Sequence, residues 1–114
     1  MATNTADGLT SRWSRILHAL LGAHTPEPVD MKTRLSRAHF RAWHRGTREA
    51  DYMIGNFFDH HHRNWSETQL AWFETLLEEE DVDIMGWALR AQAVPERLLG
   101  AQMTALQRLD YVKV

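Results

Sequence analysis

The sequence predicts an all-α protein, a compact five-helix bundle over residues 30–112 preceded by a flexible N-terminal extension over 1–29. Five successive segments carry apolar residues three and four positions apart, and no segment shows the alternation of a half-buried strand. Residues that favour helix starts precede these segments, and the connections between them are two to five residues long. Connections that short make consecutive helices pack against each other, as they do in helix bundles.

The N-terminal extension is predicted to be partly disordered, with a small polar tail over 1–8 and one short amphipathic helix over 9–22. The apolar residues of this helix lie at helical spacing: Trp13, Ile16, Leu17, Leu20 and Leu21. We interpret it as a short helix that either packs against the bundle or packs against no other part of the protein. A targeting or membrane-surface helix is the alternative, since Asp7 is the only acid among the first 26 residues. Pro26 and Pro28 then predict an extended linker.

The first two helices of the bundle are expected at about 31–44 and 48–62. Asp30 is a suitable N-cap for the first helix, and Thr47 is a suitable N-cap for the second. The inner face of the first helix is predicted from Leu35, Ala38, Ala42 and Trp43. The second helix carries its apolar face at i, i+3, i+4 and i+7 spacing, in Ala50, Met53, Ile54, Phe57, Phe58 and His61.

The third and fourth helices also have recognisable starts. Ser66 and Gln69 form a capping box, in which each side chain satisfies a backbone amide of the first turn. The apolar face that follows consists of Leu70, Phe73, Leu76 and Leu77, with Trp72 alongside. The fourth helix is expected to start near Asp81 or Asp83. Its inner face is predicted from Ile84, Met85, Ala88 and Leu89, with Trp87 flanking them.

The fifth helix is expected to begin at Pro95, because proline is favoured in a first helical turn. Its predicted stripe is Leu99, Met103 and Leu106, with Leu98 and Leu109 beside it. Gly55, Gly86 and Gly100 fall inside predicted helices, where each glycine costs about 1 kcal/mol relative to alanine. Each of them marks either a misplaced helix boundary or a close approach of two helices.

Composition and charge exclude several classes of protein. The 13 Lys and Arg against 15 Asp and Glu argue against a protein that coats nucleic acid. The absence of cysteine excludes a disulfide scaffold, a cysteine nucleophile, a zinc finger and an iron–sulfur site. The longest apolar stretch, at 16–23, is too short to span a bilayer, so no membrane insertion is expected.

The charges are strongly segregated along the chain. Residues 31–48 contain six bases and no acid, and residues 67–83 contain seven acids and no base. The simplest interpretation of each block is a solvated helix face. The alternative is a pair of opposite surface patches, one of which steers a partner. A third interpretation, in which the basic helix with Trp43 and His44 lies along a nucleic acid, lacks any accompanying motif.

No catalytic or metal site is predicted. His60, His61 and His62 follow one another on a helix, where consecutive side chains point about 100° apart and cannot converge on one metal ion. Glu49 and Asp51 lie two positions apart, on different helix faces, and do not form an acid–base pair. No nucleophile motif or phosphate-binding glycine loop is present. We therefore do not expect an enzyme.

The connection between the first two helices is the strongest candidate for function. Gly46 lies where the first helix stops, in a position that favours positive φ, and the second helix begins directly afterwards. Arg45 offers a planar fork for carboxylates, while Glu49 and Asp51 offer acceptors near the second helix start. The pattern predicts a tight corner whose tip another protein backbone can approach. An ordinary helix–helix corner with solvated charges is the alternative.

Arg45-Gly46-x-x-Glu49-x-Asp51 resembles the RGxxExD signature of the succinate dehydrogenase FAD assembly factors, the SdhE family. The resemblance extends over about residues 32–110. It includes the Phe57-Phe58 pair, the Ser66-Glu67 helix start, the acidic turn before Asp83 and Trp87, and the Pro95 segment. Many members carry a second arginine before the Arg-Gly pair, where this chain has His44.

The resemblance implies a chaperone rather than an enzyme. Members of this family bind the flavoprotein subunit of succinate dehydrogenase, and in some bacteria that of fumarate reductase. They promote covalent attachment of FAD to that subunit, whose own groups supply the chemistry. The resemblance thus implies a protein that binds no cofactor stably. It also implies a partner-binding edge made of Trp43, His44, Arg45, Gly46, Arg48, Glu49 and Asp51.

The same resemblance leads us to expect a monomer in the bacterial cytoplasm, with the mitochondrial matrix as the alternative. Two other functions stay open. Some relatives carry an antitoxin-like label, which is also a protein-binding role but on a different partner. A small helical domain that binds nucleic acid is the other alternative.

Overall fold

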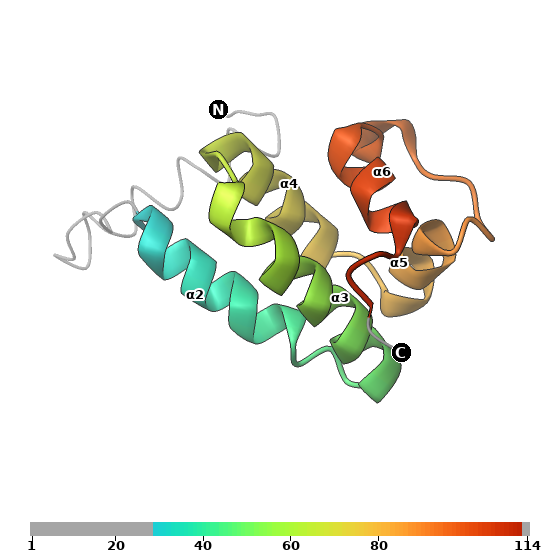
Figure 1. Ribbon diagram of the computed structural model, residues 1–114, viewed down its shortest axis with the longest axis horizontal. Coiled ribbons are helices and arrows are strands. Elements are labelled where there is room, and N and C mark those ends of the chain that lie inside the picture. The colour runs from blue at the N-terminus through green and yellow to red at the C-terminus, as the bar shows by residue number, and fades with distance from the viewer. Residues whose placement is uncertain (1–28, 113–114) are drawn as a thin grey trace, which may run out of the picture.

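The computed structural model describes residues 29–112, and this range contains five α-helices, two 3₁₀ turns and no strand (Figure 1). The prediction of an all-α bundle is confirmed. The predicted helix at 9–22 lies outside the described residues. The elements, in chain order, are α2 (Met31–Ala42), α3 (Arg48–His61), η1 (His62–Asn64), α4 (Glu67–Leu77), α5 (Asp81–Ala88), η2 (Glu96–Leu98) and α6 (Ala101–Arg108).

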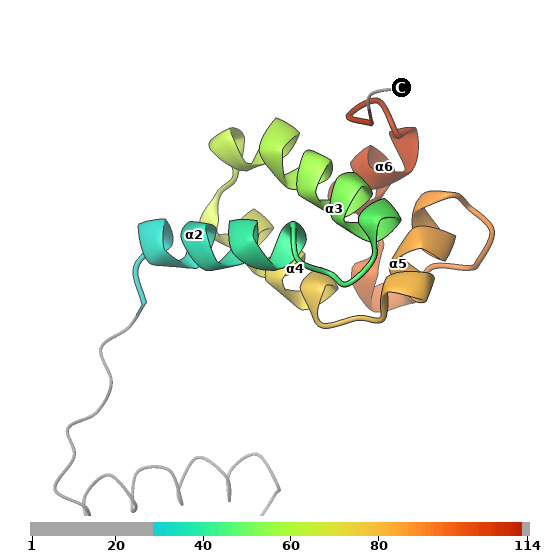
Figure 2. The ribbon, with the colours of Figure 1, turned by 90° about the horizontal axis from the view of Figure 1, so that it is seen from below.

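The helices form two groups. Helix α2 packs against both α3 and α4, while α5 packs against α6. Figures 1 and 2 show the first three helices side by side, with α5 and α6 at the end of the bundle to which the α2–α3 connection points. This arrangement brings that connection close to the turn between α4 and α5.

Three of the predicted N-caps make the expected hydrogen bonds. The Asp30 carboxylate accepts from the Thr33 amide at 2.8 Å, and the Thr47 hydroxyl accepts from the Ala50 amide at 3.1 Å. Ser66 completes a capping box with the side chain of the third residue of α4. Each such cap stabilises its helix by about 1 kcal/mol. The starts of α2, α3 and α4 therefore depend on residues that are neighbours in the sequence.

The core is a cluster of aromatic and aliphatic side chains shared by all five helices. Phe57 lies at its centre, with ring centroids 6.0 Å from Phe73 and 5.2 Å from Tyr111. The Tyr111 hydroxyl is buried and donates to the Leu106 carbonyl at 2.6 Å. Burial raises the pKa of Tyr111, so this hydroxyl remains protonated and keeps its role as a donor. Tyr111 thereby anchors the end of the described chain to the core.

The prediction for the fifth helix is wrong at its start. Pro95 precedes only the 3₁₀ turn η2, and the α-helix begins at Ala101. Gly100 has φ +146°, which an α-helical residue cannot adopt, and it separates the two segments. The interruption turns Leu98 into the core and leaves Leu99 59% exposed, the reverse of the predicted stripe.

The prediction for the fourth helix needs a similar correction. Trp87 is buried in the core, whereas Leu89 lies beyond the end of α5 and is 54% exposed. Leu89 is the C-cap of α5, and Arg90, which follows it, has positive φ, so the chain leaves the helix here. The connection that follows, 89–95, is longer than predicted.

The two charged blocks pair with each other in part. Arg34 of α2 binds Glu74 of α4 through two nitrogens, at 2.7 and 3.1 Å. Further along the same face, Nη2 of Arg41 lies 2.8 Å from Oε2 of Glu78. Arg45, which follows the helix, has its Nε 2.7 Å from Oδ1 of Asp81. These pairs engage three of the six bases of the 31–48 block, which weakens the hypothesis of two separate surface patches.

Candidate functional site

A tight corner over 43–47 connects α2 to α3. Helix α2 ends with Trp43 as its C-cap, and the His44 amide donates to the Arg41 carbonyl at 3.3 Å. Gly46 has φ +116°, a conformation that side chains with a Cβ rarely adopt. A Cβ built on Gly46 would meet nothing within 4 Å, so the tip of the corner faces open space. The predicted corner and the positive φ at Gly46 are confirmed, but α2 ends at Ala42, earlier than predicted, so Gly46 lies three positions past the C-cap Trp43.

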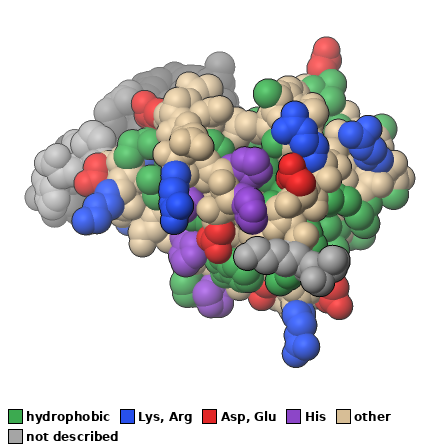
Figure 3. All heavy atoms as spheres, in the orientation of Figure 1, with side chains coloured by type: hydrophobic (Ala, Val, Ile, Leu, Met, Phe, Trp, Pro, Cys, Tyr) green, Lys and Arg blue, Asp and Glu red, His purple; other side chains and the backbone are tan. Residues whose placement is uncertain are grey.

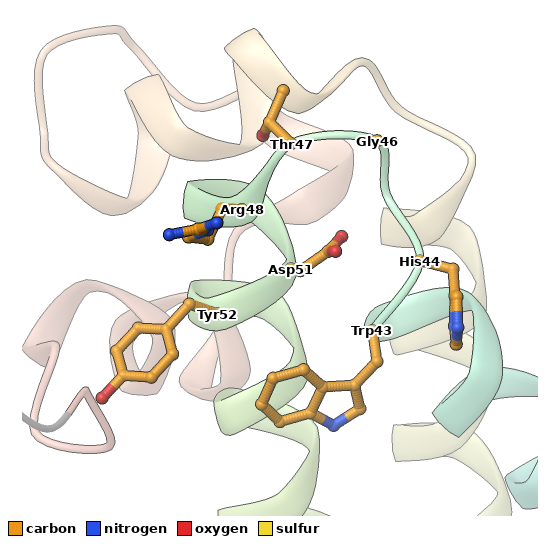
Figure 4. A pocket seen from close by; sticks show the side chains of 7 residues that line it. All are labelled: Trp43, His44, Gly46, Thr47, Arg48, Asp51 and Tyr52. Carbon is orange, nitrogen blue, oxygen red and sulfur yellow. The ribbon is translucent and has the colours of Figure 1, made fainter.

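An open groove of about 710 Å³ lies beside the corner and is lined by Trp43, His44, Gly46, Thr47, Arg48, Asp51 and Tyr52 (Figure 4). Figure 4 shows Arg48 and Tyr52 projecting from α3 on one side and His44 on the other, with Asp51 between them. Five of the seven residues predicted for a partner-binding edge line this groove. The groove is a surface depression rather than an enclosed pocket, which suits contact with another protein surface.

Trp43 is held in place by α3. Its indole lies over Gly55, where an added Cβ would be only 2.3 Å from the ring. The indole N–H donates to the Asp59 carboxylate at 3.3 Å. Gly55, which the sequence places inside a helix, therefore marks a close approach between α3 and the corner.

His44 and Phe40 form a stacked aromatic pair at the surface. Their ring centroids are 3.9 Å apart with an interplanar angle of 15°, and His44 Nδ1 lies 2.6 Å from the Phe40 carbonyl oxygen. Phe40 is 61% exposed. Sequence reasoning did not single out Phe40, although an aromatic residue on the polar face of an amphipathic helix was a usable signal. The pair widens the aromatic surface around the corner.

Arg45 points into the molecule. Its side chain is 10% exposed, and its three guanidinium nitrogens all donate hydrogen bonds. Nε donates to Asp81 at 2.7 Å, Nη1 to the Leu77 carbonyl at 2.8 Å, and Nη2 to the Glu79 carbonyl at 2.9 Å. The planar fork is therefore occupied by the end of α4 and the first residue of α5.

Asp51 closes the corner from the other side, since its carboxylate accepts the backbone N–H of Arg45. Arg48 and Glu49, in the first turn of α3, are exposed. Within the described residues neither of them makes a side-chain hydrogen bond or an ion pair. The predicted edge thus divides into inward residues that hold the corner and outward residues that are available to a partner.

The histidine run lies away from the corner, at the opposite end of α3. His62 stacks on Phe58 with centroids 4.5 Å apart, and His61 lies 4.7 Å from Phe57, in a different direction. Burial lowers the pKa of His61. Figure 3 shows histidine side chains along the face formed by α2 and α3. Among residues 29–112 no three His, Asp or Glu side chains are grouped closely enough to hold a metal ion.

Three of the six bases in the 31–48 block are engaged by acids, namely Arg34, Arg41 and Arg45. A basic stripe that follows a phosphate backbone needs those side chains free. The pairing therefore weakens the nucleic-acid interpretation. In the part of the chain that the structure describes, no helix combines the length and apolar character needed to cross a membrane.

Comparison with known proteins identifies relatives of this chain. The model of a protein family described as flavinator of succinate dehydrogenase matches residues 36–110, which include the corner, the groove and helices α3 to α6. The mitochondrial succinate dehydrogenase assembly factor 2 of Mycosarcoma maydis is 27% identical in an alignment 106 residues long, which covers 83% of this chain and 44% of that protein.

A bacterial protein, the FAD assembly factor SdhE of Acetobacter pasteurianus, is 33% identical over 67 residues, which are 59% of this chain and 62% of that protein. The chain therefore spans less than two thirds of the length of either relative. No solved structure matches it.

Proposed function

The chain belongs to the Sdh5 family, the flavinators of succinate dehydrogenase, and on this basis we propose that it is an assembly factor for that enzyme. In this proposal it binds the flavoprotein subunit of succinate dehydrogenase and promotes covalent attachment of FAD to that subunit. The observation that carries the proposal is the family match over 36–110, which contains the whole of the corner. The names of the two relatives support the same function.

The proposed mechanism is binding rather than catalysis by this chain. The flavoprotein client supplies the groups that react, and FAD is the substrate that becomes attached to the client. A partner that binds one client conformation raises the population of that conformation. Where the bound conformation brings the reacting atoms together, the reaction gains the rate advantage of correct orientation.

We assign client contact to the outward residues around the groove. Arg48 and Glu49 present exposed charged side chains, and Trp43 and His44 present aromatic surface beside the open tip at Gly46. Aromatic side chains and arginine are enriched at the centres of protein interfaces. Arg45 and Asp51 belong to the same signature but hold the corner from within.

The flavoprotein subunit of fumarate reductase is a second client in this proposal. We expect the protein to work in the compartment where the flavoprotein subunit folds, the bacterial cytoplasm or the mitochondrial matrix. The relatives come from both settings.

The test uses a strain that lacks this gene and measures covalent flavin on the flavoprotein subunit by in-gel fluorescence. We expect the deletion to lower the signal and the wild-type gene to restore it. Glu49→Ala is expected to restore it poorly while leaving the fold intact, because an exposed side chain contributes only about 0.5 kcal/mol or less to stability. Glu96→Ala, which removes an exposed acid from η2, is the matched control and is expected to restore the signal fully.

Two outcomes separate the claims in this proposal. Normal covalent flavin in the deletion strain would overturn the proposed function. A requirement for the gene, together with full restoration by Glu49→Ala and by Gly46→Arg, would leave the function standing and overturn the assignment of the edge.

A further inference from the structure

We propose that Arg45 is a positioning residue, which fastens the corner to the α4–α5 turn and so holds Gly46, Arg48 and Glu49 in the arrangement that the client binds. This inference rests on the proposed function. It assigns to the arginine of the signature a role inside the molecule, whereas the outward residues make the contact. The observations that carry it are the partners of the Arg45 side chain and of the Arg45 backbone.

The side chain of Arg45 satisfies a helix end that lacks its own basic residue. The last turn of α4 contains no base, and the final carbonyls of any α-helix have no partner within the helix. Arg45 donates to two carbonyls of this region, those of Leu77 and Glu79. A cation at this end of a helix is also favoured by the helix dipole.

The same side chain reaches the start of the next helix. Its third donor binds the carboxylate of Asp81, the first residue of α5, whose N-cap Glu80 makes no side-chain capping bond. Arg45 therefore holds both sides of the α4–α5 turn at once. The planar guanidinium presents N–H groups on three nitrogens in a fixed fork, which matches the three separate acceptors here. The donors of a lysine ammonium all lie on one nitrogen.

The backbone of Arg45 ties the corner to α3. Its N–H donates to Asp51, so one residue connects the end of α2, the first turn of α3 and the α4–α5 turn. Gly46 lies directly between this anchor and the Thr47 cap. The outward residues Arg48 and Glu49 extend from the first turn of α3, which Arg45 holds through Asp51. Their position relative to α4 and α5 therefore depends on Arg45.

Direct contact between Arg45 and a client is disfavoured by the same geometry. The side chain is 10% exposed, and a client carboxylate would have to displace Asp81 and two carbonyls from hydrogen bonds of 2.7 to 2.9 Å. Removing partners from a buried charge is costly. Arg48, three positions further along the chain at the start of α3, offers an exposed guanidinium without that penalty.

The experiment measures the dissociation constant for the purified flavoprotein subunit of succinate dehydrogenase and the melting temperature of each free variant. We expect Arg45→Lys to weaken binding about tenfold, because charged hydrogen bonds that set the corner are lost. Asp81→Asn is expected to weaken binding in the same direction, although Asp81 belongs to the inner side of the corner. Because the two changes break one connection, the double variant is expected to bind no more weakly than Arg45→Lys alone.

A matched control separates positioning from general stability. Arg34→Lys breaks a different interhelical contact, the bidentate pair of Arg34 with Glu74 between α2 and α4, which lies near the far end of α2. We expect Arg34→Lys to lower the melting temperature comparably and to leave the dissociation constant unchanged. The effect of Glu49→Ala on binding is expected to shrink to less than half in the Arg45→Lys background, because the displaced Glu49 no longer reaches the client.

Each remaining outcome decides against a stated claim. Binding unchanged in both Arg45→Lys and Asp81→Asn would make Arg45 purely structural and overturn the inference. If Arg45→Lys weakened binding, Asp81→Asn did not, and the effect of Glu49→Ala stayed fully additive, Arg45 would contact the client directly. That result would also overturn the inference. Failure of the wild-type protein to bind the flavoprotein subunit would instead overturn the proposed function, and the inference with it.

Discussion

At the scale of single residues, two glycines of the bundle have different neighbours. Gly55 faces the rigid indole of Trp43, and a Cβ added to this glycine would lie 2.3 Å from the ring. Gly86 faces the Gln92 side chain, where an added Cβ would lie 2.7 Å from the amide oxygen at its tip and 3.1 Å from its Cβ. A flexible side-chain end can move aside, whereas a ring packed between a helix and a carboxylate cannot.

We therefore predict opposite effects of alanine at these two positions. Gly55→Ala overfills the contact with Trp43, and we expect a loss of about 1–3 kcal/mol in the free energy of unfolding together with weaker client binding. Gly86→Ala relieves the helix cost of glycine, and we expect it to be neutral or to stabilise by up to about 1 kcal/mol. Urea denaturation of both variants measures the difference. Equal stability of the two would contradict the role assigned to Gly55.

Gly46 differs from both, because open space surrounds it and its constraint is the backbone angle. A bulky residue there projects outward, toward the place where the client backbone is expected. The sequence indicated this position correctly, since a glycine between two helix signals is a local feature. It did not distinguish the outward direction of Glu49 from the inward direction of Arg45.

At the scale of elements, the end of α3 packs against the last turn of the described chain through His61. Its ring lies 4.7 Å from Phe57 and 6.2 Å from Tyr111, and its Nε2 is buried without a hydrogen-bond partner among the described residues. Burial lowers the pKa of His61, with smaller opposing and reinforcing effects from Asp110, His60 and Arg108. The folded protein thus binds a proton at His61 more weakly than the unfolded chain does.

This shift predicts how stability changes with pH. As pH falls through the unfolded-state pKa of about 6.5, His61 is protonated in the unfolded chain before it is protonated in the folded protein. The free energy of unfolding therefore decreases as pH decreases. We expect His61→Gln to lose less stability than the wild type between about pH 7.5 and about pH 5.5. Identical pH dependence of the wild type and His61→Gln would contradict this account.

The elements also show which local signals were sufficient. The starts of α2, α3 and α4 agree with their predicted caps, because an N-cap bond joins residues only three positions apart. The fifth helix was predicted too early, since proline permits a helix start without requiring an α-helix. The positive φ of Gly100 delays the start of the α-helix to Ala101, and the apolar spacing of the neighbouring residues does not reveal this backbone angle.

At the scale of the whole molecule, the near-neutral net charge of −2 conceals two blocks of opposite sign, and several of their members pair with each other. Arg34, Arg41 and Arg45 lie on the side of α2 and the corner that faces α4 and α5. Such pairs contribute modestly to stability where they are exposed. They connect α2 and the corner to α4 and α5, and they occupy half of the basic side chains in the 31–48 block.

We accordingly predict weak binding to nucleic acid. A protein that neutralises many phosphates loses affinity steeply as salt rises, and paired arginines do not supply that interaction. Fluorescence anisotropy with a labelled double-stranded DNA and a single-stranded RNA is expected to show no saturable binding at physiological salt. Tight binding with a steep salt dependence would favour the nucleic-acid alternative over the assembly-factor role.

The amino-acid sequence was enough to predict the helical class, most helix starts and the position of the corner, because these follow from apolar spacing and from caps between near neighbours. The packing of the helices was needed to show which signature residues face outward, which of Leu98 and Leu99 enters the core, and how the charged blocks combine. Arg45 finds its partners 32 to 36 positions along the chain. Contacts over that separation depend on how whole helices pack, and no local pattern encodes their direction.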